Sequence, residues 1–282
     1  MPGTLFVVAT PIGNLEDITA RALRVLGEVS LIAAEDTRRT AHLLARYAIT
    51  TPTTSLHEHN EEKKGASLVE RLRHGESIAL VSDAGTPTVS DPGQRFIAAA
   101  IEAGIRVEPI PGPSAALAAL AASGLPTDTF LFLGFPPIKA KDRLEWFDAV
   151  RSATRTVVFF EAPHRIHVTL EQLLATVGDC QVAIGRELTK AHEELVRGPI
   201  SRVMLELLEA RGEFTVVVDI GRMTNMATTE PAGDAEISKE FGVLTKTRAL
   251  RRREAIARVA RRHGRTSNDV YAAIERAKKL AE

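Results

Sequence analysis

Short apolar runs alternate with amphipathic segments along the first half of the chain. Runs of the length typical of buried strands lie at 5–9, 30–34, 77–81 and 107–110. Apolar residues at helical spacing fill the intervals, at 19–26, 38–47, 61–74 and 94–103, and an Ala-rich segment at 114–123 is typical of a buried helix. Strands that alternate with helices in this way predict a parallel α/β sheet.

The second half of the chain has shorter intervals between its apolar runs. Strands are predicted at 130–135, 156–161, 181–186, 194–197 and 214–220, and helices at 141–150, 165–177 and 201–210. Fewer crossover helices favour a mixed sheet over a second parallel one. Residues 124–128, which include Gly124 and Pro126, mark the boundary between the two regions.

A third region follows a segment rich in Thr, Met, Gly and Pro at 221–234. Beyond this segment, apolar residues at helical spacing predict two helices, at 244–263 and 267–280. We therefore expect an α/β protein of four parts: a first α/β domain with a parallel sheet at 1–123, a second with a mixed sheet at 124–221, a linker at 222–237 and a small basic helical region at 238–282.

Cysteine content and hydropathy narrow the class of protein. Cys180 is the only cysteine, which excludes a disulfide framework and suits a reducing compartment. No apolar run approaches the ~20 residues of a membrane span. The first residues also lack a signal-peptide core. We expect a cytoplasmic protein without membrane attachment.

Charge is distributed unevenly, although the net charge of the 282 residues is zero. Residues 245–282 contain twelve Lys or Arg and four Asp or Glu, a net charge of +8, so the remainder carries −8. A basic tail on an acidic body predicts contact with nucleic acid, through phosphates because Tyr271 is the only aromatic residue there. The alternative is a solvated amphipathic helix face. The candidate RNA contacts are Arg251, Arg252, Arg253, Arg261 and Arg262.

The loop at 82–93 is the strongest candidate for a ligand site. Its Gly, Pro, Ser and Asp residues allow the backbone to approach a ligand closely, and it follows the predicted strand at 77–81. Ligands of open α/β sheets bind at the carboxyl ends of strands. Asp91 and Pro92 are predicted as the N-cap and first residue of the next helix. The chain lacks both the G-x-G-x-x-G fingerprint and the Lys-bearing phosphate loop, which argues against NAD and ATP.

A second polar loop, at 33–40, follows another predicted strand. Its carboxylates, Glu35 and Asp36, are candidate general bases, and Arg38 or Arg39 is a candidate phosphate contact. The alternative is an ordinary helix start, with Asp36 or Thr37 as the N-cap and the arginines on a solvated face.

Two more loops carry side chains that bind ligands in other proteins. His57 and His59 are potential metal ligands, but no partner cluster has the required spacing, so no metal site is predicted and a polar loop facing a substrate is favoured. Ser114 opens a predicted helix, whose N-terminal amides can bind a polar ligand edge. Ser114 can equally serve as the N-cap alone.

Six motifs, taken together, resemble those of a known family. They are 10–19 (TPIGNLEDIT), 34–38 (AEDTR), 82–87 (SDAGTP), 111–115 (PGPSA), 161–165 (EAPHR) and 186–190 (RELTK). In this order and spacing they resemble the ribosomal small-subunit methyltransferase I family, a group of bacterial 16S rRNA cytidine 2′-O-methyltransferases within the tetrapyrrole methylase superfamily. The resemblance covers residues 4–221 closely and the basic tail only loosely.

The resemblance implies a two-domain class III S-adenosylmethionine methyltransferase fold, a cofactor site between the domains, and a homodimer. Carried over residue by residue, it implies a cofactor site made of Pro11, Ile12, Asp83, Ala84, Gly85, Thr86, Val89, Ser114, Ala115, Phe160, Glu161 and Ala162. Two departures separate this chain from the porphyrin and corrin enzymes. The sequence at 10–13 replaces their Gly-rich first loop, and Thr86 occupies the position of their Asp.

The reaction implied by the resemblance is transfer of the cofactor's methyl group to a ribose 2′-hydroxyl of 16S rRNA in the small subunit. Asp36 and Glu35 are the candidate bases, and Arg38 or Lys190 would place an RNA phosphate or lower the pKa of the hydroxyl. A mechanism of positioning alone, with water as the proton acceptor, remains open. Two alternatives also remain: a methylase of the same fold that acts on a tetrapyrrole or a protein residue, and a non-catalytic RNA-binding or ribosome-assembly protein.

Overall fold

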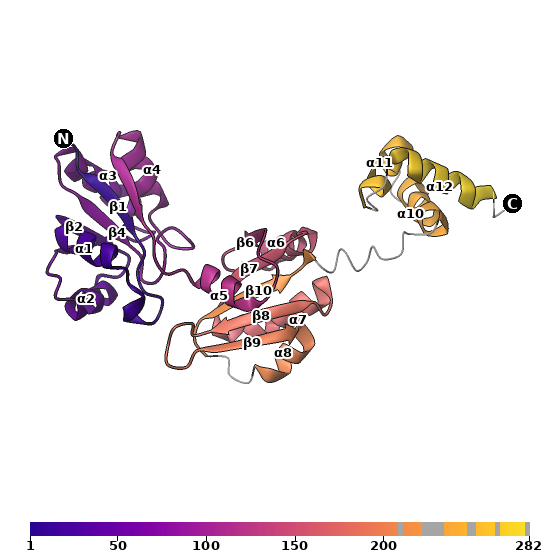
Figure 1. The fold of residues 1–282 in the computed structure, drawn as a ribbon. Coiled ribbons are helices and arrows are strands. Elements are labelled where there is room, and N and C mark those ends of the chain that lie inside the picture. The colour runs from indigo at the N-terminus through magenta and orange to yellow at the C-terminus, as the bar shows by residue number, and fades with distance from the viewer. Residues whose placement is uncertain (208–210, 222–233, 247–251, 263–265, 280–282) are drawn as a thin grey trace. The chain divides into compact units, whose positions relative to one another are not determined.

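The computed structural model describes residues 1–207, 211–221, 234–246, 252–262 and 266–279. These residues form two compact units, Met1–Ile220 and Gly221–Glu282, which we describe separately (Figure 1). The first unit contains two five-stranded sheets. Within the described ranges, no helix is both long enough and apolar enough to cross a membrane.

The first sheet has the strand order β3-β2-β4-β1-β5, and every pair of neighbours is parallel, as predicted. Its strands are β1 (Thr4–Val8), β2 (Leu31–Ala34), β3 (Thr53–Ser55), β4 (Ile78–Val81) and β5 (Arg106–Ile110). Strand β3 was not predicted, because its three residues are polar and none of them is buried. It lies at the edge of the sheet, where pairing with β2 alone is sufficient.

Helices cover both faces of the first sheet (Figure 1). Alternate residues of β4 point to opposite faces, as the strand period of two requires. Ala79 and Val81 pack with α1 (Ala20–Glu28) and α2 (Thr37–Arg46), and the 3₁₀ turn η1 (Leu15–Asp17) precedes α1. Ile78 and Leu80 pack with α3 (Glu61–Arg73) and α4 (Gln94–Glu102). All carboxyl ends of the parallel strands therefore meet at one edge between these layers.

The second sheet has the order β6-β7-β10-β8-β9 and is mixed, as predicted. Only β6 and β7 pair in parallel, and the other neighbours are antiparallel. Its strands are β6 (Phe130–Phe132), β7 (Thr156–Glu161), β8 (Gln181–Arg186), β9 (Glu194–Pro199) and β10 (Phe214–Asp219). In this register Phe214 lies opposite both Glu161 and Arg186, so these three residues share one end of the sheet.

Four helices enclose the second sheet. One face packs on α6 (Ala140–Ser152), α7 (Ile166–Val177) and α8 (Ile200–Glu206), and the turn η2 (Pro163–Arg165) leads into α7. The other face packs on α5 (Ala115–Ser123) through Val158, Ala183 and Val217. The boundary expected at residue 123 assigns α5 to the first domain, whereas its small buried side chains fit closely against the second sheet.

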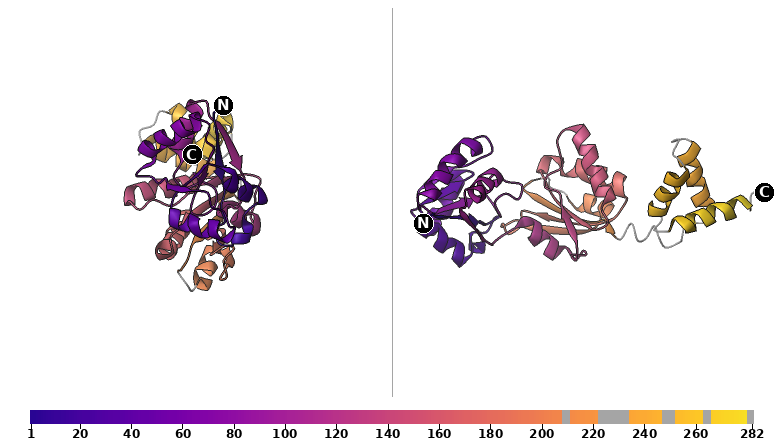
Figure 2. Two further views of the ribbon diagram at one scale, coloured as in Figure 1. Left: turned by 90° about the vertical axis from the view of Figure 1, so that its left-hand side faces the viewer. Right: turned by 90° about the horizontal axis from the view of Figure 1, so that it is seen from above.

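The second unit consists of three helices around a small core, shown from two further directions in Figure 2. They are α10 (Asp234–Lys246), α11 (Arg252–Arg262) and α12 (Ser267–Lys279). Two expectations differ from this arrangement. The helix predicted at 244–263 is replaced by the end of α10 and the whole of α11, and α10 begins inside the expected linker at 222–237. The physical reason is that Ile237 and Leu244, seven residues apart, lie on one buried face of α10.

Candidate active site

A cavity of about 420 Å³ lies in the first unit, within the size range of small-molecule sites. The first sheet contributes residues that follow the carboxyl ends of β1, β2 and β4, and the second sheet contributes residues at the shared end of β7 and β10. The N-terminus of α5 completes the wall through Ser114 and Ala115. The other lining residues are Ile12, Glu35, Arg39, Asp83, Ala84, Gly85, Thr86, Val89, Ser90, Asp91, Phe135, Phe160, Glu161, Ala162, Pro163, Glu213, Phe214 and Thr215.

Short backbone contacts hold the loop at 82–91 in place. The N–H of Thr10 donates to the carbonyl of Gly85 (2.9 Å), and the N–H of Gly85 donates to the carbonyl of Thr10 (3.0 Å). Gly85 has a φ of +86°, and a Cβ at this position would lie 3.4 Å from the Ile12 side chain. The Thr86 hydroxyl donates to the carbonyl of Pro113 (3.3 Å). Three loops from different strands therefore form one continuous wall.

The same loop contains two non-glycine residues in the left-handed region. Thr88 has a φ of +72° and Ser90 a φ of +70°, and Val89 lies between them. Such conformations cost of order 1–3 kcal/mol each and concentrate at functional sites. Here they direct Val89, Ser90 and Asp91 to the cavity wall.

The structure brings almost all the residues predicted for cofactor binding into this one cavity. Pro11 is the exception, because it lines a smaller pocket beside Arg39 and Asp83. Among the predicted catalytic residues, Glu35 lines the cavity, whereas Asp36, Arg38 and Lys190 do not. Ser114 also caps α5, and its hydroxyl accepts the N–H of Leu117 at 3.5 Å.

Asp36 is occupied as a helix cap. Its carboxylate accepts the backbone N–H of Arg38 at 2.9 Å and forms an ion pair with the Arg38 guanidinium at 2.7 Å. The hydrogen bonds from Arg38 hold the pKa of Asp36 well below its usual range. A carboxylate with so low a pKa is a weak base, so the structure favours the interpretation of Asp36 as the N-cap of α2.

Lys190 lies in the β8–β9 connection, where two carboxylates hold its ammonium group. Its Nζ is 2.8 Å from Glu187 and 3.1 Å from Glu213. The loop also touches the β1–α1 loop: the N–H of Asn14 donates to the Thr189 hydroxyl (3.0 Å), and a Cβ on Gly13 would collide with Lys190. Lys190 therefore stabilises the contact between these loops.

Three carboxylates gather at the end of the first sheet. Glu35 accepts the N–H of Asp83 (3.3 Å), and Asp83 lies 3.5 Å from the guanidinium of Arg39. Burial raises the pKa of Glu35. Burial, followed by the charge of Glu35, raises the pKa of Asp91 to about 6, and a hydrogen bond with Ser82 offsets part of this shift.

Sequence reasoning missed the position of Asp91 in the cavity wall. Asp91 and Pro92 were predicted to begin a helix, but α4 begins at Gln94 and its N-cap is Gly93, which has no side chain. Glu61 from α3 takes over the capping, because its carboxylate accepts the N–H groups of Arg95 (2.8 Å) and Phe96 (3.1 Å). A capping carboxylate from another helix leaves no signal in the local sequence.

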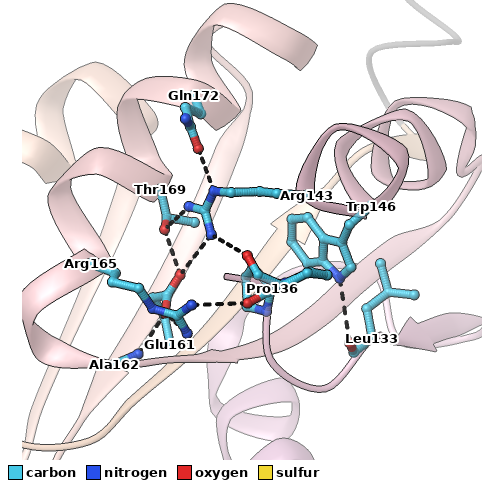
Figure 3. A network of polar contacts seen from close by, with 10 residues as sticks. Leu133, Pro136, Arg143, Trp146, Glu161, Ala162, Arg165, Thr169 and Gln172 are labelled. Carbon is cyan, nitrogen blue, oxygen red and sulfur yellow. Dashed lines mark hydrogen bonds and ion pairs between the residues drawn. The ribbon is translucent and has the colours of Figure 1, made fainter. Parts of the chain in front are cut away.

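Glu161, on the opposite wall, is fully buried in a network of polar contacts (Figure 3). Its carboxylate lies 2.7 Å from the Arg165 guanidinium and accepts hydrogen bonds from the Thr169 hydroxyl (2.5 Å) and its neighbour's backbone N–H (2.7 Å). Arg165 also donates to the carbonyl of Pro136 (3.1 Å), and Arg143 lies 3.9 Å from Glu161. The network therefore fixes the loop that places Phe135 in the cavity.

The predicted RNA contacts lie in the second unit. Arg252 and Arg253 are exposed at the start of α11, and Arg252 forms an ion pair with Glu275 (3.0 Å). Arg261 and Arg262 belong to the last turn of α11, and Arg251 lies outside the described residues. In the described part of the chain, no group of three His, Cys, Asp or Glu side chains is arranged to hold a metal ion.

Comparison with known proteins finds a matching family and similar proteins for most of this chain. Residues 4–204 match the family described as Tetrapyrrole (Corrin/Porphyrin) Methylases. A protein of Halalkalibacterium halodurans named "Ribosomal RNA small subunit methyltransferase I" is 44% identical over 271 residues, which cover 95% of this chain and 93% of the relative. One of the same name from Mesorhizobium japonicum is 50% identical over 218 residues, covering 76% of this chain and 74% of the relative.

Solved structures share the fold at lower identity. The uroporphyrin-III C-methyl transferase of Thermus thermophilus, solved in complex with S-adenyl homocysteine, has a TM-score of 0.55 and 19% identity. The similarity covers 78% of this chain and 99% of that structure. This similarity establishes a methylase fold for the first unit.

Proposed function

Because the chain belongs to the tetrapyrrole methylase family, and within it to the ribosomal RNA small subunit methyltransferase I proteins, we propose that it methylates a cytidine ribose 2′-hydroxyl in 16S rRNA with S-adenosylmethionine. The observation that carries this proposal is the 44% identity to a protein of that name over 95% of the chain. The relative's name supports RNA of the small ribosomal subunit as the substrate. The cytidine and the 2′-oxygen rest on the motifs that resemble this family.

The cavity suits S-adenosylmethionine in size and chemistry. Phe135 and Phe160 offer apolar surface to an adenosine group, and the carboxylates of Asp83 and Glu35 suit the cofactor's positive charges. When bound, the cofactor supplies an electrophilic methyl group on its sulfonium. Gly85 allows close approach of the backbone, and Ser114 and Ala115 present the N-terminus of α5.

The chain's residues contribute alignment and proton removal. Alignment of the bound reactants lowers the activation barrier by several kcal/mol, and a general base raises the rate by about 10²–10⁴-fold. Of the two bases predicted from the sequence, Glu35 has the better position, because it lines the cavity and Asp36 is paired with Arg38. Arg38 is exposed and suits contact with an RNA phosphate, whereas Lys190 acts by holding the loops of the site together.

The basic second unit supports an RNA substrate. A small tetrapyrrole offers no reason for a net charge of +8 in residues 245–282, whereas the phosphates of RNA do. Arg251, Arg252, Arg253, Arg261 and Arg262 are the proposed contacts. We also propose that the protein is cytoplasmic and forms a homodimer. Light scattering of the purified protein tests the dimer.

Mass spectrometry of 16S rRNA tests the function. Small subunits that lack the modification are incubated with the protein and methyl-labelled S-adenosylmethionine, and nuclease fragments of the RNA are analysed. We expect one labelled cytidine, with the label on the ribose. Label on a ribosomal protein, or cofactor binding without any transfer, supports an alternative and contradicts the proposal.

A further inference from the structure

A second hollow, which we call the polar groove, adjoins the cavity. Its volume is about 500 Å³. The two hollows share three wall residues, Glu35, Ser90 and Asp91. The polar groove is otherwise lined by His57, Glu58, His59, Glu61, Pro92, Gln94 and Arg95. The groove therefore borders the cavity along this shared wall.

The polar groove is built at the carboxyl edge of the first sheet. The N–H of Leu56 donates to the carbonyl of Ala34 (2.7 Å), which extends the β2–β3 pairing toward the groove. The turn that follows is fixed by Asn60, whose side-chain oxygen accepts the N–H of His57 at 2.9 Å. The buried Nδ1 of His57 has no hydrogen-bond partner within the described residues. The Asn60 contact therefore holds this loop in one conformation beside the groove.

The groove's side chains suit a nucleoside better than a phosphate. Glu61 is engaged with the start of α4, but Glu58 and His59 are exposed. Carboxylates repel phosphate, whereas they accept the exocyclic amino group of cytosine. The imidazole rings of His57 and His59, 6.0 Å apart, offer surface on which a base can stack.

Asp91 differs from most carboxylates near the reaction site. Asp36 is paired with Arg38, Asp83 with Arg39 and Glu161 with Arg165. Glu35 forms no ion pair among the described residues, but its carboxylate accepts the N–H of Asp83 at 3.3 Å. Within the described ranges, Asp91 has no ion pair with a Lys or Arg side chain. It is also one of the three residues that face both hollows.

We infer that the polar groove receives the target cytidine and that Asp91 takes the proton from its ribose hydroxyl. The inference rests on the proposed function and names the base that the sequence did not identify. As the O2′–H bond breaks, the proton passes to an Asp91 carboxylate oxygen. The O2′ electron pair forms the new bond to the methyl carbon, and the electrons of the S–C bond remain on sulfur as a neutral thioether. Asp91 then releases the proton to solvent.

The charged groups around Asp91 set the pH range over which it accepts a proton. A pKa of about 6 leaves Asp91 ionised at neutral pH while keeping it a better base than an ordinary carboxylate. We expect turnover to rise through pH 6 and to level off above it. The titratable and charged groups that face this region are Glu35, Arg39, His57, Glu58, His59, Glu61, Asp83 and Arg95.

Asp91→Asn tests the base, with Glu102→Gln, an exposed position on α4, as the matched control. We expect Asp91→Asn to lower single-turnover methyl transfer to small subunits by about 100-fold or more, and to bind S-adenosylmethionine in calorimetry within about threefold of the parent. In the parent protein, carboxyl carbon NMR should show a group that titrates near pH 6 and disappears in Asp91→Asn. Full transfer by Asp91→Asn, or loss of cofactor binding with it, overturns the role of Asp91. An inactive parent protein instead contradicts the proposed function.

Cross-linking tests the groove without relying on methyl transfer. Glu58 is replaced by the photoreactive amino acid p-benzoylphenylalanine, and the same replacement at His74, exposed and outside the groove, serves as the control. After irradiation with small subunits, sequencing locates the cross-linked nucleotide. We expect cross-links from position 58 at or next to the methylated cytidine, and none there from position 74. Cross-links elsewhere, or equal ones from both positions, overturn the assignment of the groove.

Discussion

Both walls of the cavity contain carboxylate residues, but the two sheets place these residues in different surroundings. On the second sheet, Glu161 is fully buried and its oxygens are satisfied by Arg165, Thr169 and a backbone N–H. On the first sheet, Asp91 is half-buried and has no ion pair in the described part of the chain. A carboxylate paired with an arginine fixes structure, and one without such a pair retains the capacity to accept a proton. The comparison indicates that ion pairing, more than residue type, decides whether a carboxylate holds the structure in place or takes part in the reaction.

The largest effect is expected from Glu161→Ala. Two arginines would lose a buried partner, and breaking such a pair costs about 3 kcal/mol in the free energy of unfolding. The loop that carries Phe135 would lose its anchor, so cofactor affinity should fall as well. Urea denaturation and calorimetry measure the two effects. Glu171→Ala, at an exposed position on α7, is the control, and equal stability of the two variants would remove the positioning role of Glu161.

Gly85→Ala tests the backbone of the opposite wall. The φ of +86° disfavours any residue with a Cβ, and we expect a loss of about 1–2 kcal/mol in the free energy of unfolding. The two backbone hydrogen bonds between Gly85 and Thr10 should weaken, so cofactor affinity should fall more than tenfold in calorimetry. Gly104→Ala also replaces a glycine of positive φ, +72°, but nothing lies within 4 Å of its Cβ. Cofactor affinity should remain unchanged in that control, and an equal loss in both variants would contradict the prediction.

Asp91→Asn should stabilise the protein at neutral pH although it lowers turnover. The folded-state pKa of Asp91 is raised to about 6, so folding favours the protonated form. This contribution is fully present below the unfolded pKa and is lost as pH rises through the folded pKa. Removing the charge should therefore add about 1 kcal/mol at pH 7.5, discounted for partial exposure, and little at pH 4. Denaturation at both pH values measures the difference, and a less stable variant at pH 7.5 would show that Asp91 is structural.

The sequence predicted both sheets and nearly every loop of the cavity, because strand period and turn composition are local signals. It missed features that depend on distant residues. Strand β3 is too short and polar to stand out, and it forms only beside β2. The exclusion of Asp91 from helix capping depends on Glu61, thirty residues earlier in the chain. The partners of Glu161 likewise come from three separate elements, α6, η2 and α7, and they meet only in the folded protein.

The smallest effect on stability is expected in the basic second unit. Replacing Arg251, Arg252 and Arg253 with Ala should leave the first unit intact and weaken binding to small subunits. Each phosphate contact contributes about 0.7–0.9 to the slope of log K against log salt concentration, so the loss of three contacts should flatten the slope by about 2 to 3. Filter binding at several salt concentrations measures this slope.

The matched control removes three exposed arginines of the first unit, Arg24, Arg73 and Arg106, and should keep the parent slope. An unchanged slope in the tail variant would confine these arginines to a structural role, such as the contact of Arg252 with Glu275 and Tyr271.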